Sequence, residues 1–318
     1  MVRRRRLGKK FFKSLLPILL LVVVAVVVAL AFIVYGVTRP PRRAYLVTPE
    51  SFAEISGPAL KVSDQTWRNR DNTTARGWLL KGAAGGPAVV LAHRYGVDRS
   101  WLFNLGIKIN EATGATILWP DLRGHGLNPA VSWTSFGSLE SDDIQAALDY
   151  LRTQKSTEGQ TLVGDKIGLY GIEMGAYASL RAAVSDATVR VLVLDSLPRN
   201  PEDVLQAAVR DDLEIDNRLL HFLTRNATKA YFLGRFDNTG SCELAAALKD
   251  QKVLLLSGPD AGYLRESTLE QIKCFPNKTN LETKTDLPLT GFRLPSATGE
   301  QGEGYDRIVI DFFDRNLR

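Results

Sequence analysis

The chain runs KIGLYGIEMGAYASLRAA from Lys166 to Ala183, and this stretch decides its fold. Its apolar beginning predicts a short buried strand, and its end, from Ala176 onward, predicts a helix. Between them, the residues Gly171-Ile172-Glu173-Met174-Gly175 predict a sharp turn, because glycine allows backbone conformations that other residues disfavour. Such a turn would lift the side chain of Glu173 above the carboxyl end of the strand.

Short apolar runs alternate with helix-forming stretches along most of the chain. Strands are expected at 87–92, 116–119, 166–170, 189–196 and 252–258, and helices at 138–153, 176–183 and 305–316. This alternation is typical of parallel strands joined by crossover helices. The runs are continuously apolar, as expected for strands that are buried on both faces. Ligands of such sheets bind beyond the carboxyl ends of the strands.

Three of these strands end in loops that carry recognisable motifs. The first loop is His93-Arg94-Tyr95-Gly96, the second is DLRGHG at 121–126, and the third is the glycine-flanked turn around Glu173. In this order the motifs resemble the α/β-hydrolase superfamily, particularly its serine-aminopeptidase and prolyl-oligopeptidase-like branch. The resemblance implies an α/β-hydrolase fold over residues 61–318, with a mostly parallel central sheet flanked by helices. It also places a helical cap at 198–236.

The residues that correspond to the superfamily's catalytic triad are incomplete. The superfamily orders a G-x-S-x-G serine, an acid and a histidine along the chain. Here Glu173 stands at the serine position, Asp260 lies near the acid position, and no histidine follows Asp260. Asp260 is one residue closer to its strand than usual, and a simple turn aspartate explains it equally well. Asp195 also ends a strand, where it is expected to be structural.

The three histidines of the chain offer no obvious replacement for the missing base. His93 and His125 belong to the first two motif loops, and His221 lies in the expected cap. A serine needs a base to become nucleophilic. A carboxylate at Glu173 needs none for attack, but the resemblance implies that its ester would require a water activated by histidine. We therefore predict a degenerate triad that does not turn over substrate.

The loop after the first of these strands resembles the superfamily's oxyanion loop, which usually has the sequence HGxG. His93, Arg94, Tyr95 and the elbow residue Met174 are therefore expected to line the binding site. Arg94 replaces a glycine, and its charge is opposite to that of Glu173. We hypothesise an ion pair between these two side chains across the former catalytic centre. The alternative is that Arg94 points into solvent.

The N-terminus carries seven basic residues within 1–13 and then an uncharged apolar run at 14–37. A membrane-spanning helix needs about 20 such residues, whereas a signal peptide has a core of roughly 7–15. We therefore predict a single-pass anchor in the cell membrane at 14–37, followed by a linker and domain entry at 38–60. The basic segment 1–13 favours a cytoplasmic N-terminus and an extracytoplasmic domain.

The net charge of +5 comes from this N-terminal region. Residues 1–43 hold ten basic and no acidic side chains, and the remainder has 30 basic and 35 acidic residues. The basic excess is thus a membrane-topology signal, and no nucleic-acid partner is expected. No metal site or cofactor is expected. Cys242 and Cys274, the two cysteines, form a disulfide in an oxidising compartment or remain separate thiols.

These observations leave three functional hypotheses. The first is a membrane-anchored protein with a silent hydrolase centre that acts by binding a small molecule, a peptide or a protein partner. The second is an unorthodox esterase, peptidase or dehalogenase-like enzyme that uses Glu173. The third is a structural envelope protein that keeps the fold as a scaffold. The fold does not decide among them, because function depends on the site.

Overall fold

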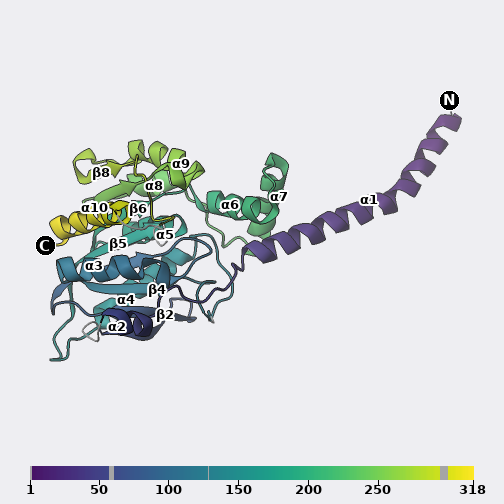
Figure 1. The fold of residues 1–318 in the computed structure, drawn as a ribbon. Coiled ribbons are helices and arrows are strands. Elements are labelled where there is room, and N and C mark those ends of the chain that lie inside the picture. The colour runs from purple at the N-terminus through teal and green to yellow at the C-terminus, as the bar shows by residue number, and fades with distance from the viewer. Residues whose placement is uncertain (1, 57–60, 128, 294–299) are drawn as a thin grey trace.

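The sheet has eight strands in the order β1-β2-β4-β3-β5-β6-β7-β8 (Figure 1). The computed structural model describes residues 2–56, 61–127, 129–293 and 300–318. The strands are β1 Val62–Arg68, β2 Thr74–Leu80, β3 Gly86–Ala92, β4 Thr116–Asp121, β5 Val163–Ile172, β6 Val189–Asp195, β7 Lys252–Leu256 and β8 Leu281–Lys284. The β1–β2 and β2–β4 pairs are antiparallel and the other pairs are parallel, which confirms the predicted sheet.

Helices cover both faces of this sheet, so each face buries its own apolar cluster (Figure 1). One cluster packs the sheet against α4 and α5, and the other packs it against α3 and α10. The helices are α1 Val2–Val37, α2 Pro49–Ser56, α3 Phe103–Thr113, α4 Glu140–Thr153, α5 Met174–Ser185, α6 Pro201–Leu213, α7 Arg218–Tyr231, α8 Ser241–Ala246, α9 Tyr263–Gln271 and α10 Glu300–Leu317.

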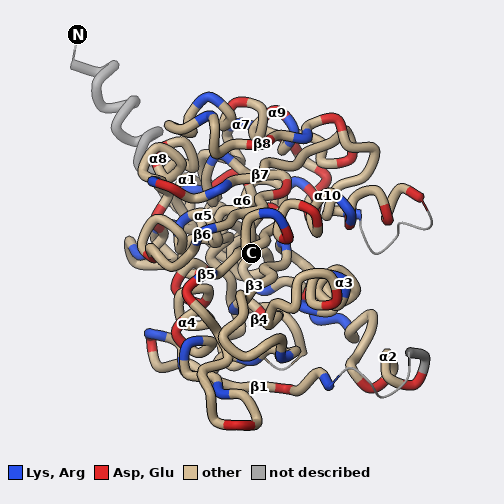
Figure 2. Tube along the Cα trace, turned by 90° about the vertical axis from the view of Figure 1, so that its left-hand side faces the viewer, with Lys and Arg blue, Asp and Glu red and all other residues tan. Residues whose placement is uncertain are grey.

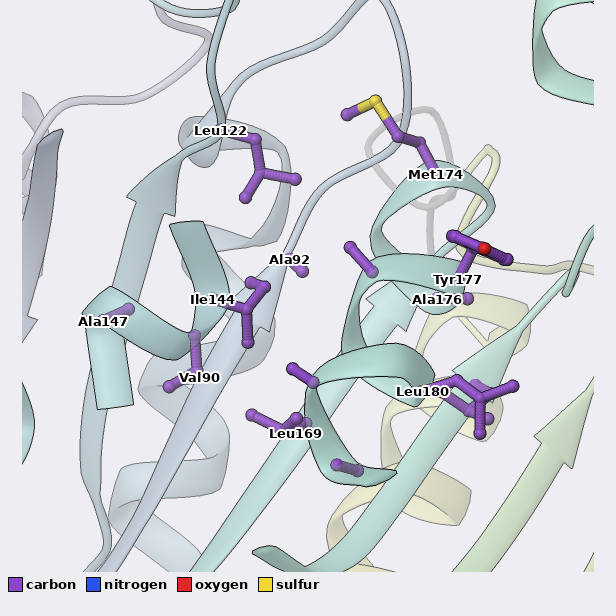
Figure 3. Packing of buried hydrophobic residues seen from close by; sticks show 14 of the residues in the cluster. Val90, Ala92, Leu122, Ile144, Ala147, Leu169, Met174, Ala176, Tyr177 and Leu180 are labelled. Carbon is purple, nitrogen blue, oxygen red and sulfur yellow. The ribbon is translucent and has the colours of Figure 1, made fainter. Parts of the chain in front are cut away.

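The turn between β5 and α5 is fixed by close packing around its two glycines. A Cβ on Gly171 would lie 2.3 Å from the carbonyl oxygen of Gly175, and a Cβ on Gly175 would lie 2.3 Å from that of Ala92. The first turn of α5 therefore sits directly against the end of β3. Below it, Val90, Leu169, Ile144 and Ala176 gather between the strands and the helices α4 and α5 (Figure 3).

The segment 198–236, where we predicted a cap, contains α6 and α7. α6 starts with Asn200, whose side chain accepts a hydrogen bond from the Asp203 N–H, and Pro201 occupies its first turn. The side chain of Asn217 caps α7 in the same way. Apolar residues of α6, including Val204 and Leu205, belong to the cluster that also holds α4 and α5.

The N-terminal helix α1 extends away from the domain and contacts it near its C-terminal end (Figure 1). Within it, Leu15–Val37 is long and apolar enough to cross a membrane, with a mean hydropathy of 3.4. A signal sequence near an N-terminus passes the same test of length and composition. The side chains of the basic segment 1–13, and residues 57–60 of the expected linker, lie outside the described part of the chain.

Two features of the C-terminal half add to the predicted architecture. Cys242 in α8 and Cys274, at the end of the short helical turn Ile272–Cys274, form a disulfide with a Cα–Cα distance of 5.1 Å. The strand β8 forms the edge of the sheet and is not among the strands predicted from the sequence. Along the domain, basic and acidic residues are interspersed (Figure 2).

Candidate functional site

Glu173 lies at the tip of the β5–α5 turn in a strained backbone conformation. Its φ is +49° and its ψ is −110°, in a region that side-chain-bearing residues rarely adopt. Such strain is typical of the elbow that presents a nucleophile in this fold. The side chain of Glu173 is nevertheless buried, and its Oε2 accepts a hydrogen bond of 3.0 Å from the backbone N–H of Tyr95.

This hydrogen bond joins the elbow to the loop that follows β3. In α/β-hydrolases the oxyanion hole consists of the N–H after the nucleophile and an N–H from the loop after β3. The corresponding groups here are the N–H of Met174 and the N–H of Tyr95. Tyr95 donates to the Glu173 carboxylate, and the backbone of Met174, the next residue, favours its charged form. The Glu173 carboxylate therefore lies against the loop that follows β3.

Burial raises the pKa of Glu173 from its ordinary value of 4.5 to about 7. Arg94 and the N–H groups of Tyr95 and Met174 favour the carboxylate and oppose this rise, but they do not cancel it. Desolvation thus outweighs hydrogen bonding at the elbow. The site changes its charge near neutral pH.

We hypothesised an ion pair between Arg94 and Glu173, but no ion pair joins these two side chains in the structure. The guanidinium carbon of Arg94 lies 4.9 Å from the ring centroids of both Trp101 and Phe292, and its Nη1 donates to the carbonyl oxygen of Tyr95. The aromatic rings hold the charge beside the elbow by cation–π attraction. Its charge still acts on Glu173 through space.

Met174 and His93, two of the residues expected to line the site, have buried side chains with other contacts. The side chain of Met174 belongs to the core and accepts a hydrogen bond from Thr134 at its Sδ. Only its backbone faces the elbow carboxylate. His93 accepts a hydrogen bond from the Leu122 N–H at Nε2 and contacts the Arg94 carbonyl oxygen through Nδ1.

His93 and His125 tie the first two motif loops together as neutral rings. His125 accepts a hydrogen bond of 3.1 Å from the Gly96 N–H, and its other ring nitrogen contacts the Arg123 carbonyl oxygen. Burial lowers the pKa of His93 to about 4 and that of His125 to about 3. Each ring thus has its hydrogen bonds committed to backbone groups, and neither is positioned to serve as a base.

Asp260 lies at the predicted acid position, in a short helical turn just after β7. Its Oδ2 accepts hydrogen bonds from the backbone N–H and the hydroxyl of Thr290, at 2.9 and 2.8 Å. Thr290 belongs to the loop where this fold normally supplies its histidine. The Oδ1 of Asp260 is buried and has no hydrogen-bond partner among the residues that the structure describes. The structure thus gives Asp260 a threonine partner in place of a histidine.

Asp195 is structural, as expected from its position at the end of β6. Its carboxylate accepts hydrogen bonds from the Gly291 N–H, the Tyr305 hydroxyl and the Ser196 hydroxyl. Burial raises its pKa to about 6, although these hydrogen bonds favour the charged form. The network fixes the loop at 290–292 against the sheet and so positions the partners of Asp260.

A cavity of about 400 Å³ opens above the elbow, and Glu173, Arg94, Tyr95 and Asp260 line it. A volume of this size suits a small ligand, since such pockets measure about 300–1,000 Å³. The remaining lining includes Val204, Ala207, Ala208, Arg210, Asp211 and Asp212 from α6, together with Ala261, Gly262, Tyr263 and Phe292. The first motif loop, the elbow, the turn that holds Asp260 and the segment 198–236 thus meet at one cavity.

Several residues of this cavity were not predicted from the sequence. Asp211, Asp212, Tyr263 and Phe292 all line it, and none of them belongs to a recognised motif. The consecutive acidic residues at the end of a cap helix would have been a usable signal. Nothing in the sequence marks Tyr263, which reaches the cavity because α9 follows directly after the Asp260 turn.

No protein-family model matches this sequence. Among curated proteins, it is 27% identical over 128 residues to the thiohydrolase apmlB of Arthrinium phaeospermum, covering 40% of each chain. It is 25% identical over 131 residues to the polyketide transferase ATR5 of Stachybotrys chlorohalonatus, covering 41% of this chain and 42% of that protein. The chain spans about two fifths of the length of these curated relatives.

Solved structures are similar over a larger part of the chain. The esterase Pf2001 of Pyrococcus furiosus is 21% identical, with a TM-score of 0.63 over 88% of this chain and 100% of the esterase. The α/β hydrolase GrgF of Penicillium sp. sh18 is 17% identical, with a TM-score of 0.60 over 81% of this chain and 99% of that one. An acylaminoacyl peptidase of Pyrococcus horikoshii is 12% identical, with a TM-score of 0.58 over 86% and 44% of the two chains. These likenesses confirm the expected fold.

Proposed function

This chain has the α/β-hydrolase fold, and on that premise we propose that it is a membrane-anchored binding protein whose hydrolase centre is silent. The observation that carries the proposal is the hydrogen bond from the Tyr95 N–H to the Glu173 carboxylate. An oxyanion hole lowers the barrier only if its donors are free to bind the charge that develops in the transition state. Here a side chain of the protein takes at least one of these donors.

The missing histidine supports the same proposal. Asp260 contacts Thr290, and the three histidines lie outside the lining of the cavity above Glu173. An ester formed on Glu173 would therefore lack a base to activate the hydrolytic water. Removing members of a catalytic triad costs several orders of magnitude in rate.

The cavity itself supports binding of a ligand that carries an amine and a carbonyl group. Asp260 Oδ1, an acceptor, and Arg94 Nε, a donor, are both buried without a hydrogen-bond partner in the described part of the chain. Such groups are costly unless a ligand or water satisfies them. The cavity also holds four carboxyl groups and two guanidinium groups, so it favours a cation. The ligand class is an amine-bearing small molecule or peptide.

The placement of the protein follows from α1. We propose that Leu15–Val37 is an uncleaved, single-pass anchor in the cell membrane, with the N-terminus in the cytoplasm and the domain outside. The apolar run is longer than the core of a signal peptide. The end of the helix also packs into the domain, where Val34 and Val37 are buried, so removal of the helix would expose apolar surface.

We expect 6-aminohexanamide to bind the full-length chain at least about tenfold more tightly than hexanamide, which lacks the amine. A hydrogen bond to a charged group contributes about 1.5–3 kcal/mol, and 1.4 kcal/mol is a factor of ten. Affinity for the amine should also rise from pH 6 to pH 8, because Glu173, with a pKa of about 7, becomes charged over this range. Isothermal titration calorimetry in detergent micelles measures both effects.

The matched variants for this experiment are Asp260→Asn and Asp165→Asn. Asparagine at 260 would turn the free acceptor into a donor, so the preference for the amine should be lost. Asp165 is exposed and lies outside the cavity, and its variant should bind like the wild type. Equal affinity of wild type for the two probes, or no binding of either, would contradict the proposed ligand class.

One observation favours the second candidate, an active esterase, peptidase or dehalogenase-like enzyme that uses Glu173. With a pKa of about 7, Glu173 is suited to accept a proton at neutral pH. The burial of its carboxylate against the Tyr95 N–H argues against this role, because a base or nucleophile must reach the substrate. Measurement of turnover separates the two candidates.

A further inference from the structure

The region around α7 exposes an unusual share of apolar side chains. Outside α1, nine large hydrophobic residues of the described chain are exposed, and six of them lie between positions 213 and 233. They are Leu213, Ile215, Leu219, Phe222, Tyr231 and Leu233. Single exposed apolar residues need no explanation, but a cluster on one element indicates an interaction surface.

The exposed residues on α7 form a face opposite to its buried side. Thr224 and Thr228 face the domain and are buried. Leu219 and Phe222, three residues apart and hence on one side of the helix, are 65% and 54% exposed. α7 therefore turns two large apolar side chains outward, in addition to Leu220, which packs against the core.

The end of α1 lies next to α7 (Figure 1). This neighbour indicates what covers the exposed face of α7. Arg39, just beyond α1, donates to the hydroxyl of Tyr231 at 3.0 Å. The guanidinium of Arg39 also lies over the ring of Tyr35, 3.8 Å from its centroid. Aromatic and basic residues of this kind are enriched where a membrane helix leaves the hydrocarbon core.

The length of the apolar run places α7 at the bilayer surface. At 1.5 Å per residue, the 23 residues of Leu15–Val37 span about 35 Å, slightly more than the roughly 30 Å hydrocarbon core. The excess lies in the last turn or two of α1. Val34 and Val37 in these turns are buried in the domain, so the domain and α7 are held close to the headgroups.

We propose that α7 lies on the bilayer leaflet from which α1 emerges, with Leu219 and Phe222 inserted between the lipid headgroups. This inference rests on the proposed role of α1 as a membrane span. Interfacial helices bury their apolar face about 5–10 Å into the boundary between headgroups and acyl chains. Four acidic residues precede α7, namely Asp211, Asp212, Glu214 and Asp216. α7 itself carries Arg218, Arg225 and Lys229, and the last two pair with Glu202. The local charges therefore largely offset one another, so apolar insertion, and not attraction to anionic lipid, drives the contact.

The test is the depth of single fluorescent labels on the full-length chain in phosphatidylcholine nanodiscs. The two native cysteines are joined in a disulfide, so a bimane reagent labels only an introduced cysteine. The variants are Leu219→Cys, its control Leu269→Cys, which replaces an exposed leucine of α9, and Val23→Cys within the span. Quenching by brominated lipid reports insertion, and quenching by iodide reports contact with water.

We expect brominated lipid to quench the label at 219 severalfold more than the label at 269, and iodide to show the reverse order. The label at 23 should be quenched by brominated lipid alone. If position 23 is inserted but 219 behaves like 269, the anchor stands and the surface role of α7 is overturned. If position 23 is open to iodide as well, the anchor itself is overturned, and the inference about α7 falls with it.

Discussion

Replacing Glu173 with glutamine is expected to stabilise the folded chain by about 3 kcal/mol at pH 8. The pKa of Glu173 rises on folding from 4.5 to about 7, and each pKa unit corresponds to 1.36 kcal/mol. A group with a raised folded-state pKa contributes stability below pH 4.5 and loses it as the pH rises through 7. Glutamine is isosteric with the protonated acid and never acquires the charge, so it avoids this loss.

The difference in stability between Glu173→Gln and wild type should therefore depend on pH. It should be near zero at pH 4.5, grow through the window between pH 4.5 and 7, and stay constant above it. Chemical denaturation of the full-length chain at a series of pH values measures the curve. Glu158→Gln, at an exposed position, is the control and should change stability by less than about 0.5 kcal/mol. A difference that does not vary with pH would mean that Glu173 is not a buried acid.

Asp143→Asn is expected to destabilise the chain by about 3–5 kcal/mol, the cost of breaking a buried ion pair. Asp143, in α4, accepts hydrogen bonds from the guanidinium and from the backbone N–H of Arg123. The two side chains are only 2% and 4% exposed, so the guanidinium would lose its buried carboxylate partner and keep only Asp71, whose side chain is 44% exposed. Arg123 belongs to the loop whose His125 holds Gly96, so the variant should also loosen the Tyr95 loop.

The matched control is Asp149→Asn in the same helix. Asp149 pairs with Arg70 at 3.0 Å, but the side chains are 52% exposed for Arg70 and 49% for Asp149. Exposed pairs contribute about 0–1 kcal/mol, so this variant should unfold almost like the wild type. Equal losses from the two variants would show that the loop at 121–126 does not depend on its buried ion pair.

The sequence was sufficient for the architecture because the fold depends on patterns that are local. The glycines that flank Glu173 are enough to predict the turn. The apolar runs of β3, β5 and β6 predict these strands without reference to the rest of the chain. The strand β8 was missed because Leu281–Lys284 is mostly polar and exposed, as an edge strand is allowed to be. Its pairing with β7 is determined by tertiary structure alone.

The site was predictable only in its residue types. Glu173 and Asp260 could be placed by motif and order, but the contact of the Glu173 carboxylate with the Tyr95 N–H depends on how two loops meet. Arg94 was expected to pair with Glu173 because the opposite charges were the visible signal. The aromatic rings that hold it, Trp101 and Phe292, are far apart in the sequence and carry no motif.

The elbow keeps two energetically costly features, a buried carboxylate and a strained backbone, both at Glu173. A buried carboxylate raises the cost of folding at neutral pH, so Glu173 is not explained by stability alone. The strained backbone of the elbow is also retained, with φ at +49°. Strain and buried charge at one position are typical of functional sites, and here we assign that function to the binding of a ligand in the cavity above it.

The most direct test of this account is turnover by the full-length chain beside Glu173→Ala, on a panel of esters, aminoacyl amides and haloalkanes. We predict that both proteins show the same background rate on every substrate, because the elbow contributes no chemistry. Turnover by wild type that disappears in Glu173→Ala would contradict the account and identify Glu173 as the nucleophile or base of an active enzyme.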